Sequence, residues 1–192
     1  LQFQILQAHS GFTANHPYIS SPWSWPLLIN PVWYFMEKST DLSSAKLVFF
    51  QGNPVILWTG LIAFGFCFKR MLDGSHVAFV ITSVFLVNYL VWIMSTRKTM
   101  FFYYYYPSAM MLSVALGYLY IGWLNKFKTQ IRNTIVSVYF LLAIGMFIFF
   151  YPLLTGMDVK AVDFHKWMWF DSWQLKGENN KPAIEYKIKT TP

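Results

Sequence analysis

Four long apolar stretches constrain the fold of this chain more than any other feature of its sequence. They cover roughly residues 54–69, 77–94, 101–124 and 131–155, and charged residues occur only at their ends, as Lys69 does in the first stretch. An α-helix rises about 1.5 Å per residue and the hydrocarbon core of a bilayer is about 30 Å thick, so a spanning helix needs about 20 residues. The last two stretches reach this length, and we expect the first two to recruit flanking residues. The sequence therefore predicts an all-α integral membrane protein with four transmembrane helices.

The composition favours a membrane protein over a soluble domain. Of the 192 residues, 56% are hydrophobic and 12% are charged, whereas soluble domains carry about 25% charged residues. Four buried helices of this kind in a soluble protein would need a much larger polar shell. A channel or transporter is disfavoured because it needs polar residues within its spans, and Asn88 is one of few there.

The net charge of +7 indicates membrane lipid as a partner and gives no support for nucleic acid, because the basic residues are dispersed and form no stripe along a polar helix.

The single cysteine, Cys67, excludes an internal disulfide. No cofactor is evident. The histidines lack the spacing of metal ligands, so no metal site is expected; they are His9, His16, His76 and His165.

The apolar stretches divide the chain into four regions. We expect an extracytoplasmic aromatic-rich segment over residues 1–53, the four-helix membrane region over 54–155, a second aromatic segment over 156–175 and a polar tail over 176–192. In the first segment, closely spaced prolines exclude a long helix; they are Pro17, Pro22 and Pro26. Its tryptophans are typical of a membrane interface. We therefore expect irregular structure there, lying on the bilayer surface or packed across the mouth of the helical bundle.

Two further prolines mark expected helix starts. Asn53 precedes Pro54, so the amide is expected to cap the first spanning helix, with proline tolerated in the first turn. Pro107 follows the tyrosine run near the start of the third span, and we expect it to kink or unwind the first turns there.

The positive charges predict an orientation in the membrane. The connections after the first and third spans share one side and are rich in cations, namely Lys69, Arg70, Lys126, Lys128 and Arg132. By the positive-inside rule this side is expected to be cytoplasmic. Both aromatic segments and the connection at residues 95–100 then share the extracytoplasmic face.

Arg97 and Lys98 lie in this connection, directly before an aromatic run that includes Tyr103 to Tyr106. Adjacent cations facing an aromatic wall at a bilayer boundary form a suitable clamp for an anionic lipid head group. Two plainer interpretations stay open: the cations anchor helix ends by reaching toward the interface, and the tyrosines form an ordinary aromatic belt.

Four blocks, in order along most of the chain, resemble the C-terminal four-helix membrane module of the protein O-mannosyltransferase family. They are His16-Pro17-Tyr18 with Trp23 and Trp25-Pro26, then Asn53-Pro54 with Trp58, then Arg97 with Phe101 to Pro107, and last Trp169 with Trp173. Many relatives carry a histidine in the aromatic turn, where this chain has tyrosines, and this departure bears on acceptor choice.

The resemblance implies a membrane glycosyltransferase of the GT-C type. Such enzymes transfer mannose from a polyprenyl or dolichyl phosphate carrier to Ser or Thr of proteins, in the bacterial plasma membrane or the endoplasmic reticulum. In the family an acidic pair near the first extracytoplasmic loop supplies catalysis. The chain starts at Leu1 without a methionine, so we expect a C-terminal piece whose catalytic acids lie upstream. The spacing of Asp158, Asp163 and Asp171 is typical of solvated residues, and none is assigned as the base.

The site residues carried over with this resemblance are donor phosphate-binding Arg97 and Lys98, and a substrate pocket of Tyr103, Tyr104, Tyr105, His16, Trp23 and Trp25. The lipid-phosphate-linked sugar is the expected donor, and a dimer is left open. The alternatives are a related transferase of the aminoarabinose-to-lipid-A type and a non-catalytic membrane scaffold or partner-binding subunit.

Overall fold

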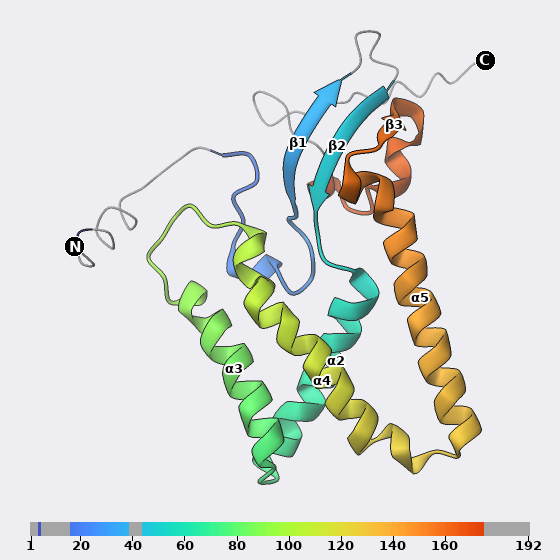
Figure 1. The fold of residues 1–192 in the computed structure, drawn as a ribbon. Helices are drawn as coiled ribbons and strands as arrows, with labels where there is room; N and C mark the ends of the chain where they lie inside the picture. The colour runs from blue at the N-terminus through green and yellow to red at the C-terminus, as the bar shows by residue number, and fades with distance from the viewer. Residues whose placement is uncertain (1–3, 5–15, 39–43, 175–192) are drawn as a thin grey trace.

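The structure, a computed structural model, describes residue 4 and residues 16–38 and 44–174 (Figure 1). The expected polar tail at 176–192 lies outside the described residues, as does most of the chain before residue 16.

Four long helices form most of the described part of the chain. They are α2 (Pro54–Leu72), α3 (His76–Ile93), α4 (Tyr106–Gly122) and α5 (Thr129–Thr155). Each matches one apolar stretch of the sequence, and each is long and apolar enough to cross a membrane. For α4 this length includes the short 3₁₀ turns at its two ends, so that the third span covers Phe102–Lys126. The prediction of four transmembrane helices is confirmed. At the start of the third span, residues Phe102–Tyr105 form a 3₁₀ turn and Pro107 lies in the first turn of α4, as expected from the proline.

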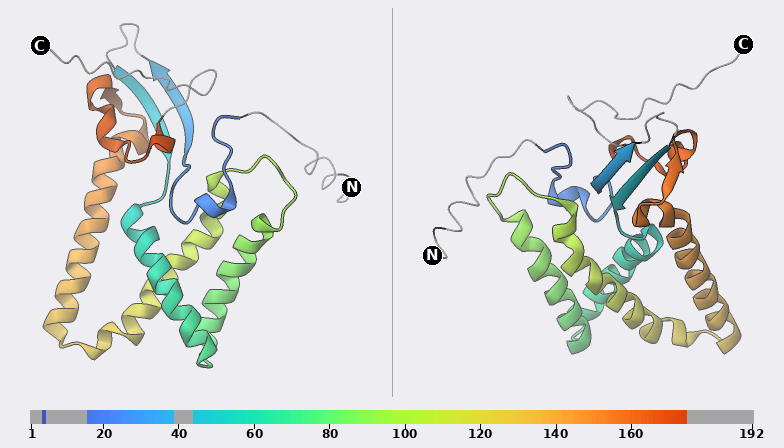
Figure 2. Two further views of the ribbon diagram at one scale, coloured as in Figure 1. Left: turned by 180° about the vertical axis from the view of Figure 1, so that it is seen from behind. Right: turned by 45° about the horizontal axis from the view of Figure 1, so that its top comes forward.

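Helices α2, α3 and α4 pack together, while α5 stands beside them (Figures 1 and 2). Small residues allow α2 and α4 to approach closely: a Cβ added at Gly60 would lie 2.6 Å from Cβ of Leu112. Ala63 and Ala115 are fully buried in the same region. Within a bilayer the lipid is as apolar as the helices, so the hydrophobic effect does not drive helices together. Close van der Waals packing of this kind stabilises their association instead.

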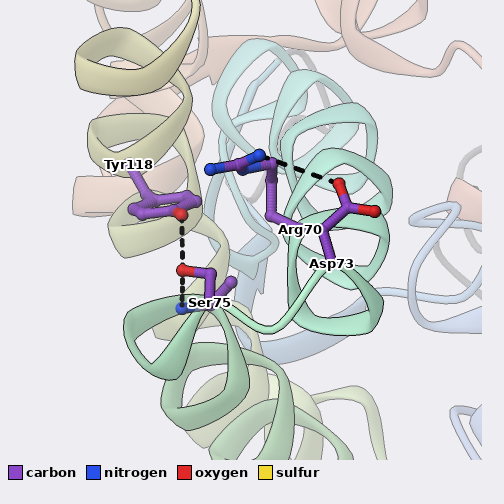
Figure 3. A network of polar contacts seen from close by, with 5 residues as sticks. Arg70, Asp73, Ser75 and Tyr118 are labelled. Carbon is purple, nitrogen blue, oxygen red and sulfur yellow. Dashed lines mark hydrogen bonds and ion pairs between the residues drawn. The ribbon is translucent and has the colours of Figure 1, made fainter.

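Polar side chains fix two helix starts. The Asn53 side-chain oxygen accepts from the backbone N–H groups of Val55 and Ile56, which confirms the expected cap, and its Nδ2 donates to the carbonyl of Ala143 on α5 at 2.8 Å. At the opposite end of the bundle, Ser75 caps α3 and its hydroxyl lies 2.8 Å from the Tyr118 hydroxyl on α4 (Figure 3).

A small antiparallel sheet, which the sequence pattern does not predict, covers one end of the helices (Figure 1). Its strands are β1 (Val32–Lys38), β2 (Ser44–Phe50) and β3 (Asp158–Lys160), in the order β1-β2-β3. The expectation of irregular structure before residue 53 is therefore wrong for the hairpin β1–β2. Its aromatic and β-branched residues favour strands, but in a chain this apolar their hydrophobicity alone did not reveal the pairing.

The two flanking segments form one unit at this end. Trp33 Nε1 on β1 donates to the carbonyl of Trp173 at 2.9 Å, and Trp173 Nε1 donates to the carbonyl of Leu28 at 2.6 Å. The rings of both tryptophans are buried among Phe49 and Phe164. Because residues 28–33 and 173 are far apart in sequence, these bonds join the segment before the helices to the segment after them.

Candidate functional site

The connection between α3 and α4 lies at the same end of the helices as the sheet (Figures 1 and 2). The first segment holds it there through backbone and ring contacts. Ser20 N–H donates to the carbonyl of Met100 at 2.9 Å, and the rings of His16 and Phe101 are nearly perpendicular with centroids 5.1 Å apart. From α3, the Tyr89 hydroxyl donates to the carbonyl of Pro22 at 2.9 Å. The cation pair and the aromatic segments therefore share one end of the bundle.

Arg97 lies half-buried against aromatic rings. Its guanidinium carbon is 5.3 Å from the centroid of the Tyr104 ring, and Tyr104 stacks on Trp92 with centroids 4.3 Å apart and planes 13° apart. A cation over a ring face is stabilised by about 0.5–2 kcal/mol. We call Arg97, Trp92 and Tyr104 the Arg97 site.

The charge of Arg97 is not neutralised within the described part of the chain. Its Nε is buried without a hydrogen-bond partner, and neither ion pair found among the described residues involves it. A buried guanidinium N–H without a partner is costly, and carboxylate or phosphate oxygens match its donors. The site is therefore suited to an anionic ligand that reaches the end of the bundle.

The four consecutive tyrosines differ in burial: Tyr103 and Tyr104 are half-buried, Tyr105 is buried and Tyr106 is exposed. Tyr103 stacks with Phe101, with centroids 5.4 Å apart and planes 12° apart, and lies 6.2 Å from the ring of Tyr34 on β1. Tyr105 is fully buried and its hydroxyl has no partner among the described residues. Partial burial raises the pKa of Tyr34. Tyr103 and Tyr104 thus form an aromatic wall beside Arg97.

The remaining residues expected at the site differ in their burial and in their distance from Tyr104. His16 is exposed at the rim beside Phe101. Trp25 is fully buried, 6.4 Å from the Tyr104 ring, and its Nε1 donates to the Ser20 hydroxyl at 2.8 Å. Trp23 is 69% exposed and Lys98 is also exposed. The structure therefore brings together Arg97, the tyrosine wall, His16 and Trp25, and leaves Trp23 and Lys98 at the surface.

Two residues near this end were not singled out from the sequence. Trp92 stacks against Tyr104, and its position beside the last residue of α3 is the only sequence signal for it. Gln51 follows β2 and is 6% exposed, yet neither its amide oxygen nor its amide nitrogen has a partner among the described residues. Nothing in the sequence distinguished Gln51 from a surface glutamine.

The aspartates at this end are at least partly exposed to solvent. Lys166 Nζ donates to Asp163 Oδ1 at 2.6 Å and holds the pKa of that carboxyl below its ordinary value. Asp158 lies in β3 and Asp171 begins a short 3₁₀ turn. Within the ranges that the structure describes, no group of His, Cys, Asp or Glu side chains is arranged to hold a metal ion.

Comparison with known proteins finds a family model and several relatives. Residues 1–173 match the model described as the C-terminal four-transmembrane region of protein-O-mannosyltransferase. A polyprenol-phosphate-mannose–protein mannosyltransferase of Corynebacterium glutamicum is 28% identical, over 88% of this chain and 35% of that protein. A protein of the same name from Mycobacterium tuberculosis is 25% identical, over 86% of this chain and 35% of that protein. The chain thus spans about a third of the length of these curated relatives.

A solved structure has the same fold. It is the Saccharomyces cerevisiae protein O-mannosyltransferase Pmt1-Pmt2 complex bound to the sugar donor, with a TM-score of 0.73 and 19% identity, over 91% of this chain and 26% of that chain. The sheet and the four helices are therefore a recurring arrangement.

Proposed function

Because this chain belongs to the protein-O-mannosyltransferase family, whose C-terminal four-transmembrane region it matches over residues 1–173, we propose that it forms the donor-phosphate-binding part of a membrane mannosyltransferase. The donor is mannose on a polyprenyl or dolichyl phosphate, and the acceptor is a Ser or Thr hydroxyl of a protein. The relatives named above are protein mannosyltransferases, which supports this reading over the aminoarabinose and scaffold alternatives.

One observation carries the proposal: the Nε of Arg97 is buried and has no hydrogen-bond partner among the described residues. The donor brings a phosphate at the depth of the membrane interface, and a guanidinium binds two phosphate oxygens with parallel hydrogen bonds. When the bond between mannose and phosphate breaks, negative charge grows on the departing phosphate. Arg97 stabilises that charge where little water competes, which is where such contacts lower a barrier most.

The neighbouring residues take supporting roles in the proposal. Lys98 adds positive charge at the entrance, and Tyr103 and Tyr104 contact the sugar or the carrier through their ring faces and hydroxyls. His16 lies at the rim, on the acceptor side. Trp25 and Tyr105 are fully buried, so they hold the wall in position, while exposed Trp23 contacts lipid or acceptor. No acid or base is assigned to this region.

The proposal includes an orientation and a dimer. We place the sheet and the Arg97 site on the extracytoplasmic face of the bacterial plasma membrane or the endoplasmic reticulum, because the opposite end carries most of the cations in the helix connections. Cys67 is fully buried, so a Lys98→Cys variant offers one accessible thiol. A membrane-impermeant maleimide is expected to label it only from outside the cytoplasm.

The solved relative is a complex of two proteins. Mass photometry in detergent tests whether the protein that carries this chain also forms a dimer.

Transfer assays on the protein that carries this chain test the central role. Arg97→Ala is expected to lower the rate of mannose transfer by about 100-fold, the loss typical for one preorganised donor to a developing anion. Arg97→Lys keeps the positive charge but cannot form two parallel hydrogen bonds with the phosphate, so a partial loss of the transfer rate is expected. Lys160→Ala is the matched control, because it removes a cation from β3 at the same end of the bundle. Unchanged transfer by Arg97→Ala would refute the proposal.

A further inference from the structure

A hollow lined by cations lies at the opposite end of the helices from the Arg97 site. It lies between the ends of α2 and α4 and has a volume of about 580 Å³. This volume is within the range of about 300–1,000 Å³ that is usual for small-ligand sites. We call it the Arg70 cavity, and we propose that it binds the phosphate of an anionic phospholipid from the leaflet at that end.

The charges that line the cavity are mostly positive. Lys69 and Arg70 come from the last turn of α2 and Lys126 comes from the 3₁₀ turn after α4. Asp73 is the single acid among the lining residues. Because Lys126 is far in sequence from the adjacent Lys69 and Arg70, its position beside them is a property of the fold.

The one acid leaves Arg70 available to a ligand. Nη1 of Arg70 lies 3.7 Å from Oδ2 of Asp73, beyond hydrogen-bond distance, and both side chains are 48% exposed. An ion pair this exposed contributes little. Figure 3 shows the guanidinium on the side of α2 that faces Tyr118 of α4. Among the described residues, neither Lys69 nor Lys126 forms an ion pair.

The walls of the cavity are apolar and lead toward lipid. Phe66, Leu119 and Trp123 line it, and so does Ile62, which is 72% exposed although it lies within the span of α2. Gly122 completes the wall: a Cβ there would lie 3.2 Å from the Phe66 ring, so a larger residue narrows the space. Positive charge at the helix ends and an exposed apolar path into the membrane together match a phosphate group that carries acyl chains.

The same phosphate chemistry has two sources, a lipid head group and a soluble phosphate, and the apolar wall selects the lipid. Cations that merely anchor helix ends would bind no lipid selectively. The site is also separate from the Arg97 site, since α2 runs from Pro54 at the sheet end to Leu72 at the cavity end.

Native mass spectrometry of the intact protein in detergent tests the proposal. Phosphatidylglycerol and phosphatidylcholine with the same acyl chains are added in turn, and retained lipid is counted. Wild type is expected to retain phosphatidylglycerol, with an affinity at least about tenfold higher than that for phosphatidylcholine. Arg70→Gln is expected to reduce that affinity by about tenfold, because it removes a charge-assisted donor, and Arg70→Lys by less. The matched control is Lys128→Gln, which removes a cation from the same end but outside the cavity and is expected to retain the lipid as wild type does.

Three results would overturn the proposal. The first is equal retention of the two lipids by wild type. The second is an equal loss in Arg70→Gln and Lys128→Gln, which indicates a diffuse surface charge effect. The third is complete release of phosphatidylglycerol by millimolar inorganic phosphate, which identifies a soluble anion as the ligand. If Arg70→Gln unfolds by circular dichroism, Gly122→Leu supplies the test, because it fills the cavity without changing charge and is expected to reduce retention to a similar extent.

Discussion

Replacing Asn53 tests how the first helix is tied to the last. The Asn53 side chain accepts from Val55 N–H at 3.0 Å and from Ile56 N–H at 3.4 Å, and it donates to the carbonyl of Ala143 at 2.8 Å. Losing the cap costs about 1 kcal/mol, and an interhelical hydrogen bond in a membrane protein contributes about 0.6 kcal/mol. Asn53→Ala is therefore expected to lower the free energy of unfolding by roughly 1.6 kcal/mol.

Asn53→Ser separates the two contributions. Serine is an equally good cap, but its hydroxyl is too short to reach the carbonyl of Ala143 on α5. Only the interhelical bond is lost, so the expected decrease is about 0.6 kcal/mol. Unfolding by sodium dodecyl sulfate in mixed micelles, followed by circular dichroism, measures both variants against wild type. Equal decreases for Ser and Ala would contradict the reasoning, because they would mean that the cap adds nothing.

The other predictions concern packing and charge. Gly60→Ala is expected to destabilise the fold by about 1–3 kcal/mol, because its Cβ would lie 2.6 Å from a neighbouring side chain; Gly65→Ala meets nothing within 4 Å and is expected to leave the detergent melting temperature unchanged or higher. Trp173→Ala is expected to cost about 3–5 kcal/mol, since the side chain is fully buried, and limited proteolysis should then release the segment after α5 while the helices stay protected. The pKa of Asp163 is lowered in the folded state by Lys166, so its contribution to stability is present above the ordinary carboxyl pKa and is lost as pH falls through the lowered value. Asp163→Asn is therefore expected to weaken the dependence of stability on pH only in the acid range, and an identical acid profile for variant and wild type would count against the pairing.

The membrane helices were predictable because a long apolar run has only one simple solution. A helix satisfies every backbone polar group within itself, so about 20 apolar residues in a bilayer become helical whatever surrounds them. The predicted stretches and observed helices agree closely: the fourth stretch, 131–155, corresponds to α5 at Thr129–Thr155. The helix starts also followed from local chemistry, since the Asn53 cap and the position of Pro107 depend only on neighbouring residues.

The sheet was not predictable by the same reasoning. Strand β1 (Val32–Lys38) carries five consecutive apolar or aromatic residues before Glu37, so the alternation between its two faces is weak. The stability of the sheet depends on partners far along the chain: β3 at 158–160 pairs with β2, and the carbonyl of buried Trp173 accepts from Trp33 on β1. Contacts of this range leave no local pattern in one sequence.

The candidate site was predictable in part. Arg97 and the tyrosines were chosen because cations and aromatic rings at an interface suit a lipid phosphate, and the structure places Tyr104 against the guanidinium. Their roles in binding stay predictions. Trp92 and the buried amide of Gln51 were missed because their position depends on the path of the chain between elements. For Trp25 the sequence leaves two placements open, at the membrane interface or packed onto the helical bundle, and its full burial agrees with the packed one.

Direct binding of a polyprenyl phosphate that carries no sugar tests the central claim without requiring transfer. Fluorescence titration in detergent is expected to give a Kd for Arg97→Ala at least about tenfold higher than for wild type, because a charged hydrogen-bond pair is lost. Lys160→Ala is expected to bind as wild type does. Equal Kd values for Arg97→Ala and wild type would contradict the assignment of Arg97 as the phosphate-binding residue.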